Sequence, residues 1–99
     1  MIIVGRGRLD DAIKSGQIPP VPARCWFAEA CDARWLKAGD VLEHYKGTEL
    51  VGKNGLVIPL DEAGHCVGVL ASFVSGALVI IFAGHRRDNP MGNGKAGRS

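Results

Sequence analysis

The sequence predicts a mainly β protein, a small antiparallel barrel or sandwich built as one domain. Short apolar or alternating runs of strand length recur from residue 41 onward, separated by turn-forming clusters. The 14 glycines and 5 prolines are typical of a fold rich in turns and loops. A chain of 99 residues can bury a single modest core, so we expect no second domain.

The first 22 residues are expected to form a separate N-terminal region. A short apolar strand opens the chain at 1–4, and a short helix over 9–15 ends at Gly16. The glycines at 5 and 7 lack the third glycine of a dinucleotide-binding turn, so no nucleotide site is expected there. The three prolines within 19–22 predict an extended, polyproline-like arm.

Residues 24–37 are compatible with two structures. The apolar residues of this segment recur at helical spacing, yet a strand over 23–29 followed by a turn at Asp32 fits equally well. In both structures the aromatic side chains Trp26, Phe27 and Trp35 are core or contact residues.

From residue 37 onward, turn clusters delimit five expected strands. These strands are 41–45, 49–52, 56–60, 65–74 and 78–84. Asn54-Gly55 predicts a type I′ hairpin, because both residues tolerate positive φ. Pro59 donates no ladder hydrogen bond, so its strand is expected at an edge or interrupted there.

The stretch 66–84 contains no charged residue and is long enough to span a membrane as a helix. Its small central residues instead predict a β-hairpin that turns at Ser75-Gly76. If the stretch spanned a membrane, the basic residues that follow it would place the C-terminus in the cytoplasm. The long N-terminal part would then have to cross the membrane without a signal peptide. A small protein with one span at 66–84 is therefore an alternative and not the main prediction.

The run Leu78 to Phe82 does not alternate between apolar and polar residues. Such a block indicates burial on both faces, which a chain of this size can hardly supply alone, so we expect self-assembly. Residues 88–99 are polar and glycine-rich, and predict a flexible tail. The expected organisation is thus an N-terminal region at 1–22, a β-domain at 23–87 and a tail at 88–99.

The charges and reactive side chains predict no catalytic site, metal site or cofactor. A net charge of +2 without a basic cluster argues against nucleic-acid and membrane partners. The histidines 44, 65 and 85 are widely spaced, and neighbours such as His65 and Cys66 point to opposite faces of a strand, so they do not form a zinc pattern. The 3 cysteines lack ligand spacing and are expected as reduced thiols.

One enzymatic alternative depends on the order of three motifs. Cys25, the LKAGD segment (36–40) and His65 before Cys-Val-Gly-Val occur in the order that resembles cell-wall cysteine peptidases and amidases. In those families the cysteine opens a helix, whereas Cys25 follows a proline-rich segment and no third residue is identified to orient the base. Cys25 and His65 are the residues on which this alternative depends.

A second set of motifs covers residues 21–85. LKAGDVL (36–42), KGTELVGKNGLVIPL (46–60), CVGVLASFV (66–74) and LVIIFAG (78–84) follow one another. In this order the chain resembles the head-decoration, or cement, proteins of tailed bacteriophages. The resemblance implies a non-enzymatic virion protein on the capsid surface that binds the major capsid protein, commonly as a homotrimer. The residues expected at its interfaces are Ile18, Pro19, Pro20, Val21, Pro22, Trp26, Trp35, Leu78, Ile80 and Phe82.

Overall fold

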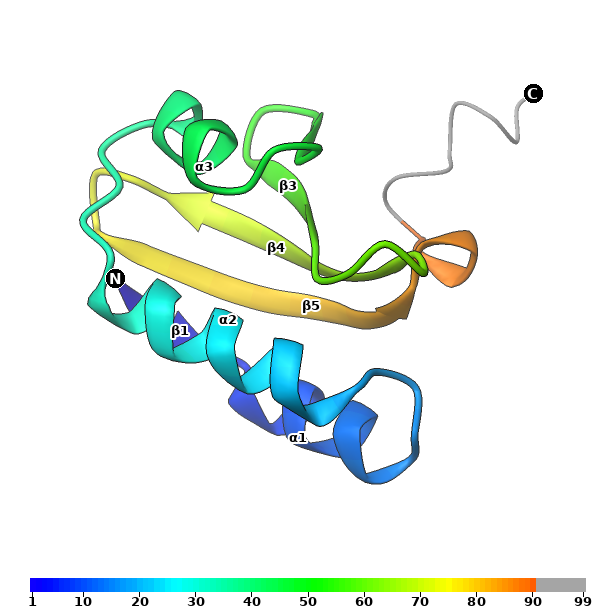
Figure 1. Ribbon diagram of the computed structural model, residues 1–99. Helices are drawn as coiled ribbons and strands as arrows, with labels where there is room; N and C mark the ends of the chain where they lie inside the picture. The colour runs from blue at the N-terminus through cyan, green and yellow to red at the C-terminus, as the bar shows by residue number, and fades with distance from the viewer. Residues whose placement is uncertain (91–99) are drawn as a thin grey trace.

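A five-stranded sheet in the order β1-β5-β4-β3-β2 organises the computed structural model, which describes residues 1–90 (Figure 1). The strands are β1 (Ile2–Val4), β2 (Glu49–Val51), β3 (Gly55–Pro59), β4 (His65–Ser72) and β5 (Ala77–His85). β1 runs parallel to β5, and the other neighbours are antiparallel. The sheet stays open at β1 and β2, so the predicted barrel is wrong and the domain is mixed α/β.

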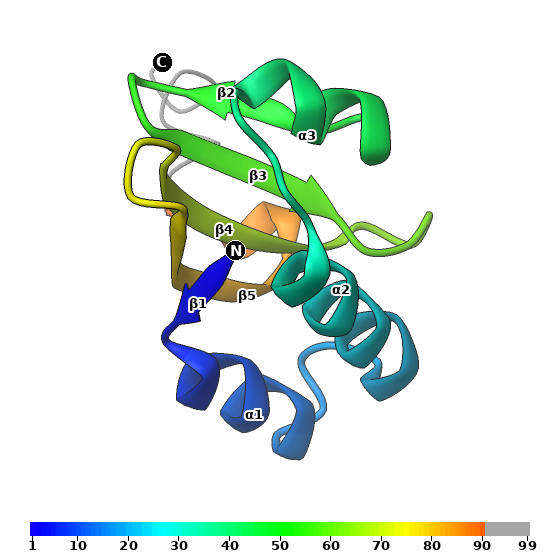
Figure 2. The ribbon, with the colours of Figure 1, turned by 90° about the vertical axis from the view of Figure 1, so that its left-hand side faces the viewer.

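Three helices and a short 3₁₀ turn complete the part of the fold that residues 1–90 form. They are α1 (Arg6–Lys14), α2 (Pro20–Asp32), α3 (Ala38–His44) and η1 (Arg86–Asp88). Figure 2 shows α2 and α3 on one side of the strands and α1 alongside β5, and residues of all three helices belong to one core with the sheet. We call the sheet surface that faces this core the inner face, and the opposite surface the outer face. Because helices cover the inner face, the sheet need not close on itself to bury it.

The predicted proline-rich arm is wrong, because residues 20–32 are helix α2. Pro20 occupies the first helical position, where the missing N–H would have had no partner within the helix, and Pro19 precedes it in extended conformation. Ala23, Trp26 and Ala30 recur on one side of α2 and are buried. The prolines therefore begin a helix, and the helical alternative for 24–37 is the correct one over most of its length.

The strand expected at 41–45 is also wrong, since residues 38–44 form α3. The carboxylate of Asp40 accepts a hydrogen bond of 2.9 Å from the Leu36 N–H, and the fully buried Val41 attaches the helix to the core. The turn predicted at 37–40 overlaps the start of this helix, and the first turn of a helix has backbone angles close to those of a type I turn. The same residues are therefore compatible with a turn and with the start of a helix.

Both predicted hairpins exist. β4 and β5 join through Gly76, whose φ of 72° requires the left-handed region, so the predicted turn at 75–76 is confirmed. β2 and β3 also pair, but the predicted type I′ turn at Asn54-Gly55 is wrong, because neither residue has a positive φ and Gly55 already belongs to β3. The left-handed residue of this hairpin is Gly52, with φ 65°. Pairing with β2 stops at Val57, so Pro59 lies beyond it, as its missing N–H requires.

Strand register explains how Leu78 and Ile80 of the block 78–82 are buried within the described part of one chain. Leu78 and Ile80 point to the inner face and are at most 1% exposed, whereas Val79 between them lies on the outer face and is 38% exposed. An irregularity in the pairing near Gly68 and Val69 lets the inner-face pattern continue to Ala83. The expected burial of this block between subunits is therefore not needed for Leu78 and Ile80.

The two ends of the described chain belong to the folded unit. β1 is part of the sheet, and Leu9 and Ala12 of α1 are buried in the core. Asp88 ends η1 and Asn89 is buried, so the predicted tail does not begin at 88. The rest of that predicted tail, 91–99, lies outside the described residues.

Candidate functional site

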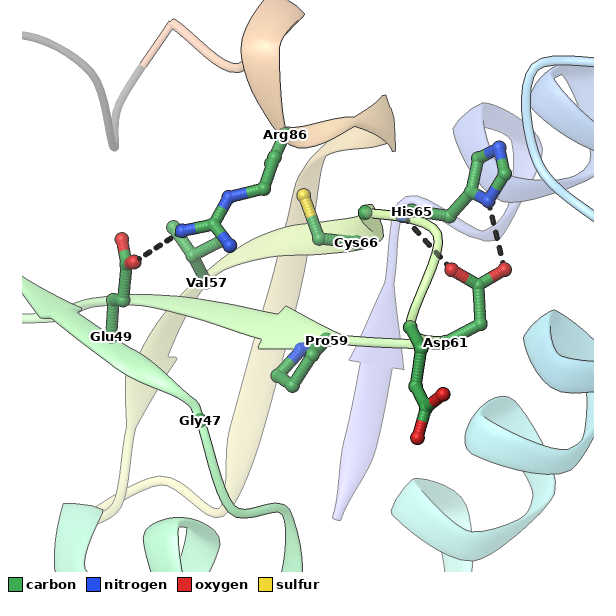
Figure 3. A pocket seen from close by; sticks show the side chains of 10 residues that line it. Gly47, Glu49, Val57, Pro59, Asp61, His65, Cys66 and Arg86 are labelled. Atoms are coloured by element: carbon green, nitrogen blue, oxygen red, sulfur yellow. Dashed lines mark hydrogen bonds and ion pairs between the residues drawn. The ribbon is translucent and has the colours of Figure 1, made fainter.

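The candidate site is a pocket of about 290 Å³ at the end of the sheet where β3 finishes and β4 begins. Figure 3 shows that strand ends, the β3–β4 loop and the segment after β5 supply its side chains. Its lining residues are Gly47, Glu49, Val57, Pro59, Asp61, Glu62, Gly64, His65, Cys66 and Arg86.

A carboxylate and an imidazole form the chemical centre of this pocket. Asp61 Oδ2 lies 2.8 Å from His65 Nδ1, and Asp61 Oδ1 accepts the backbone N–H groups of Ala63 and His65 at 3.0 and 3.1 Å. Partial burial acts to raise the pKa of Asp61, but the hydrogen bonds and the charge of His65 outweigh it, and the pKa lies below its ordinary value. The ionised carboxylate therefore holds the Nδ1 proton and leaves Nε2 of His65 able to accept one.

A second imidazole lies beside the first. The rings of His65 and His85 are 5.7 Å apart in an edge arrangement. His85 Nδ1 accepts a hydrogen bond from the Arg87 N–H at 3.2 Å, so Nε2 carries the proton and donates to the Ala63 carbonyl at 3.0 Å. Gly64 is required here, because its φ is 103° and a Cβ would lie 2.7 Å from His85 Nε2.

An ion pair and a buried thiol form the other side of the pocket. Arg86 donates to Glu49 Oε2 at 2.8 Å, and the sulfur of Cys66 lies beside this pair (Figure 3). Burial is the main cause that raises the pKa of the Cys66 thiol to about 11, with Arg86 acting in the opposite direction. Cys66 is therefore a neutral thiol at physiological pH and a poor nucleophile.

Cys25, the thiol of the enzymatic alternative, lies on the exposed surface of α2. The helix begins at Pro20, so Cys25 is in its second turn, away from the N-terminal N–H groups that activate a thiol. Within residues 1–90 no hydrogen bond joins Cys25 to His65, whose Nδ1 is held by Asp61. Sequence analysis found no orienting partner for His65, although Asp61 precedes it at a spacing typical of a side-chain-stabilised turn.

Near Cys25 on α2, Glu29 is the centre of a polar and aromatic cluster. Tyr45 donates a hydrogen bond to Glu29, and His44 Nε2 is 3.9 Å from the same carboxylate. His44 and Tyr45 stack with ring centroids 4.4 Å apart, and Trp35 meets both rings edge-on. Burial, followed by the bond to Glu29 and its charge, raises the pKa of Tyr45, so this phenol stays protonated and ties α2 to α3.

The residues predicted at interfaces divide into two groups. Five of them are at most 7% exposed and form part of the monomer's own core, namely Ile18, Trp26, Trp35, Leu78 and Ile80. Pro20 and Val21 are exposed at the start of α2, and Pro19, Pro22 and Phe82 are half-buried. The interface itself stays a prediction. In this fold only the residues of the second group have exposed side-chain surface that could contact another protein.

The outer face carries an apolar row that sequence analysis missed. Register places Val4, Val79, Leu70, Gly55 and Val51 opposite one another across all five strands. We call these five residues the outer row. Val4 is 50% exposed, Leu70 is 44% exposed, and Ile2 on the same face is 66% exposed. Only strand pairing brings these residues together, so no local sequence signal identifies the row.

Three further observations concern metal binding, membrane spans and similarity to known proteins. Among residues 1–90, no three histidine, cysteine, aspartate or glutamate side chains converge as metal ligands. None of the helices within that range is both long enough and apolar enough to cross a membrane. No protein-family model and no curated protein matches the chain.

Proposed function

We propose that this chain is a non-enzymatic assembly protein that attaches to a larger protein shell, in the manner of phage head-decoration proteins. Its partner is then the major capsid protein, its place is the outside of the virion, and a homotrimer is the favoured form. The observation that carries the proposal is the outer row, which lies on a sheet face that no helix among residues 1–90 covers.

The composition of the outer row is unusual for a surface in contact with water. A sheet with one open face normally alternates apolar residues inward with polar residues outward. Here the outward positions of β1, β5 and β4 include Val4, Val79 and Leu70 in adjacent register. Each is about half exposed, so covering each side chain contributes about 1 kcal/mol of association free energy. A contiguous apolar patch of this kind is typical of a protein contact surface.

Co-sedimentation with purified tailed-phage capsids that lack their own decoration protein tests the proposal. The double variant Leu70→Thr with Val79→Thr keeps β-forming side chains but removes apolar surface from the outer row. Leu36→Thr is the matched control, since Leu36 is an aliphatic residue 78% exposed and outside the sheet. We expect the wild type and the control to pellet with capsids, and the double variant to stay in the supernatant with an unchanged thermal midpoint. Absence of wild-type binding at micromolar concentration, or equal binding by all three proteins, would refute the assignment.

A second candidate is a cell-wall cysteine peptidase or amidase that uses Cys25 and His65. The observation that favours it is the Asp61 carboxylate on His65 Nδ1, which orients a base at the start of β4. Peptidoglycan cleavage in a zymogram tests this candidate. Loss of cleavage in Cys25→Ser, with activity kept in Cys31→Ser, would establish it, because both cysteines are exposed and lie on α2. Absence of cleavage by the wild type would exclude it.

A further inference from the structure

Helix α3 lies at the β2–β3 end of the sheet, and both ribbon views place α1 at the opposite end of the molecule (Figures 1 and 2). Residues 33–37 connect α3 to α2, and residues 45–48 connect it to β2. Neither connection contains a helix or a strand. Because loop residues of this kind absorb changes in φ and ψ, α3 can move relative to the sheet without unfolding a neighbouring element.

Few side chains of α3 are buried. Among its 7 residues only Val41 is buried, whereas Glu43 and His44 are exposed. A helix shorter than about 12 residues is marginal in water on its own. The position and the helical form of α3 therefore depend on its contacts with the rest of the domain.

The polar contacts at the end of α3 converge on one carboxylate of α2. Tyr45, which directly follows α3, donates a hydrogen bond to Glu29, and His44 Nε2 lies 3.9 Å from the same carboxylate. The rings of His44 and Tyr45 stack with their centroids 4.4 Å apart, and Trp35 meets both rings edge-on. Release of Glu29 would therefore loosen His44 and Tyr45 together.

The solvent exposure of Glu29 limits the strength of this attachment. Its side chain is 51% exposed, so water competes for the carboxylate oxygens. A hydrogen bond to a charged group is stronger than a neutral one, but exposure to water reduces its net contribution. We expect its loss to change the ratio of attached to detached α3 several-fold, and not to unfold the domain.

We propose that α3 is a flap that opens as a unit from the inner face while the sheet stays folded, and that Glu29 is the latch that holds it closed. Opening withdraws Val41 from the core and exposes the inner face at the β2–β3 end of the sheet. Segments with few buried apolar side chains open locally more readily than core strands do. The flap lies on the inner face and the outer row on the opposite face, so this inference does not depend on capsid binding.

Native-state amide exchange, measured by NMR on the intact protein without capsids, tests the proposal. The reporter for the flap is the Tyr45 amide, which donates to the Val41 carbonyl at 2.8 Å. The reference is the set of amides in the central ladder between β4 and β5. Tyr45→Phe and Glu29→Ala remove the latch, and Glu43→Ala is the matched control, because Glu43 is an exposed glutamate on the flap itself. Leu78→Ala weakens the core of the domain at a position outside the flap.

In the wild type we expect the flap amide to exchange at least about tenfold faster than the ladder amides. Each latch variant should speed exchange of the flap amide by about fivefold, and Glu43→Ala should not speed it. Leu78→Ala should speed the ladder amides about a hundredfold and leave the flap amide unchanged, because opening of the flap does not disturb residue 78. The proposal is overturned if the flap amide is as protected as the ladder, if Leu78→Ala speeds both equally, if neither latch variant speeds the flap amide, or if Glu43→Ala matches Glu29→Ala.

Discussion

Replacing Leu78 with alanine should destabilise the protein far more than the same change at the neighbouring Val79. Leu78 is fully buried on the inner face, so the substitution loses the transfer free energy of its side chain and leaves a cavity, together about 3 kcal/mol. Val79 is 38% exposed on the outer face, and its truncation should cost less than about 1 kcal/mol. The free energy of unfolding of a domain is about 5 to 15 kcal/mol, so the first loss is a large fraction of it.

Urea unfolding followed by tryptophan fluorescence measures the difference. Trp26 and Trp35 are both buried, so their emission reports global unfolding. With a urea dependence near 1.5 kcal/mol per molar, Leu78→Ala should lower the midpoint by about 2 M and Val79→Ala by less than about 0.7 M. Equal losses would refute the assignment of these residues to opposite faces. A Val79→Ala loss that grows with protein concentration would instead show that copies of the chain cover the outer face in solution.

Three further predictions follow from single positions. Gly5→Ala should destabilise the fold by about 2 kcal/mol, because residue 5 has a positive φ and its Cβ would approach the β5 backbone. Gly7→Ala, at an open position in α1, should instead stabilise the fold by about 0.5 kcal/mol. Thermal melting of both variants measures these changes. Asp61→Asn should cost about 1 kcal/mol at pH 6. The folded-state pKa of Asp61 is lowered, so its contribution is present above the ordinary carboxyl range and is lost as pH falls through that range and below it. Denaturation at several pH values should show wild type and variant converging at acid pH. Cys66 should be the last thiol to react with iodoacetamide, since with a pKa of about 11 only about one molecule in a thousand is thiolate at pH 8, and mass spectrometry that finds it alkylated first would contradict the burial argument.

The strands with strong local signals were predictable from sequence. The hairpin of β4 and β5 follows from small residues between two apolar runs, and the first strand from its apolar residues at 1–4. α1 was expected over 9–15 and occupies 6–14, a difference at its ends only. In these segments the local pattern and the tertiary environment favour the same structure.

The failures occur where one local signal is compatible with two structures. Prolines at 19–22 indicate an extended arm, but the same residues are suited to the first turn of a helix, and only the burial of Trp26 against the sheet decides between them. The residues at 37–40 predict a turn and those at 41–45 a strand, whereas packing of Val41 makes residues 38–44 a helix. Tertiary contacts outweighed propensity in both cases.

The candidate site was less predictable than the fold, because its parts come from separate strands. His65 was noted as a strand-opening residue, but its partnership with Asp61 depends on the conformation of the loop between β3 and β4. Glu49 and Arg86 meet only because β2 and the end of β5 border the same pocket. Likewise, the outer row becomes visible only when the register of all five strands is known.

The pairing of β1 with β5 also has a consequence for how the chain folds during its synthesis. β1 is made first, yet among residues 1–90 its only partner in the sheet is β5, the last strand of that range, and α1 also packs against β5. Contacts between residues so distant in sequence form late in folding, because a long loop must be ordered before they form. The apolar surfaces of β1, α1 and α2 therefore stay without their sheet until residue 85 has left the ribosome. During that interval the nascent chain is expected to depend on chaperones, and truncation within β5 should leave a product that aggregates.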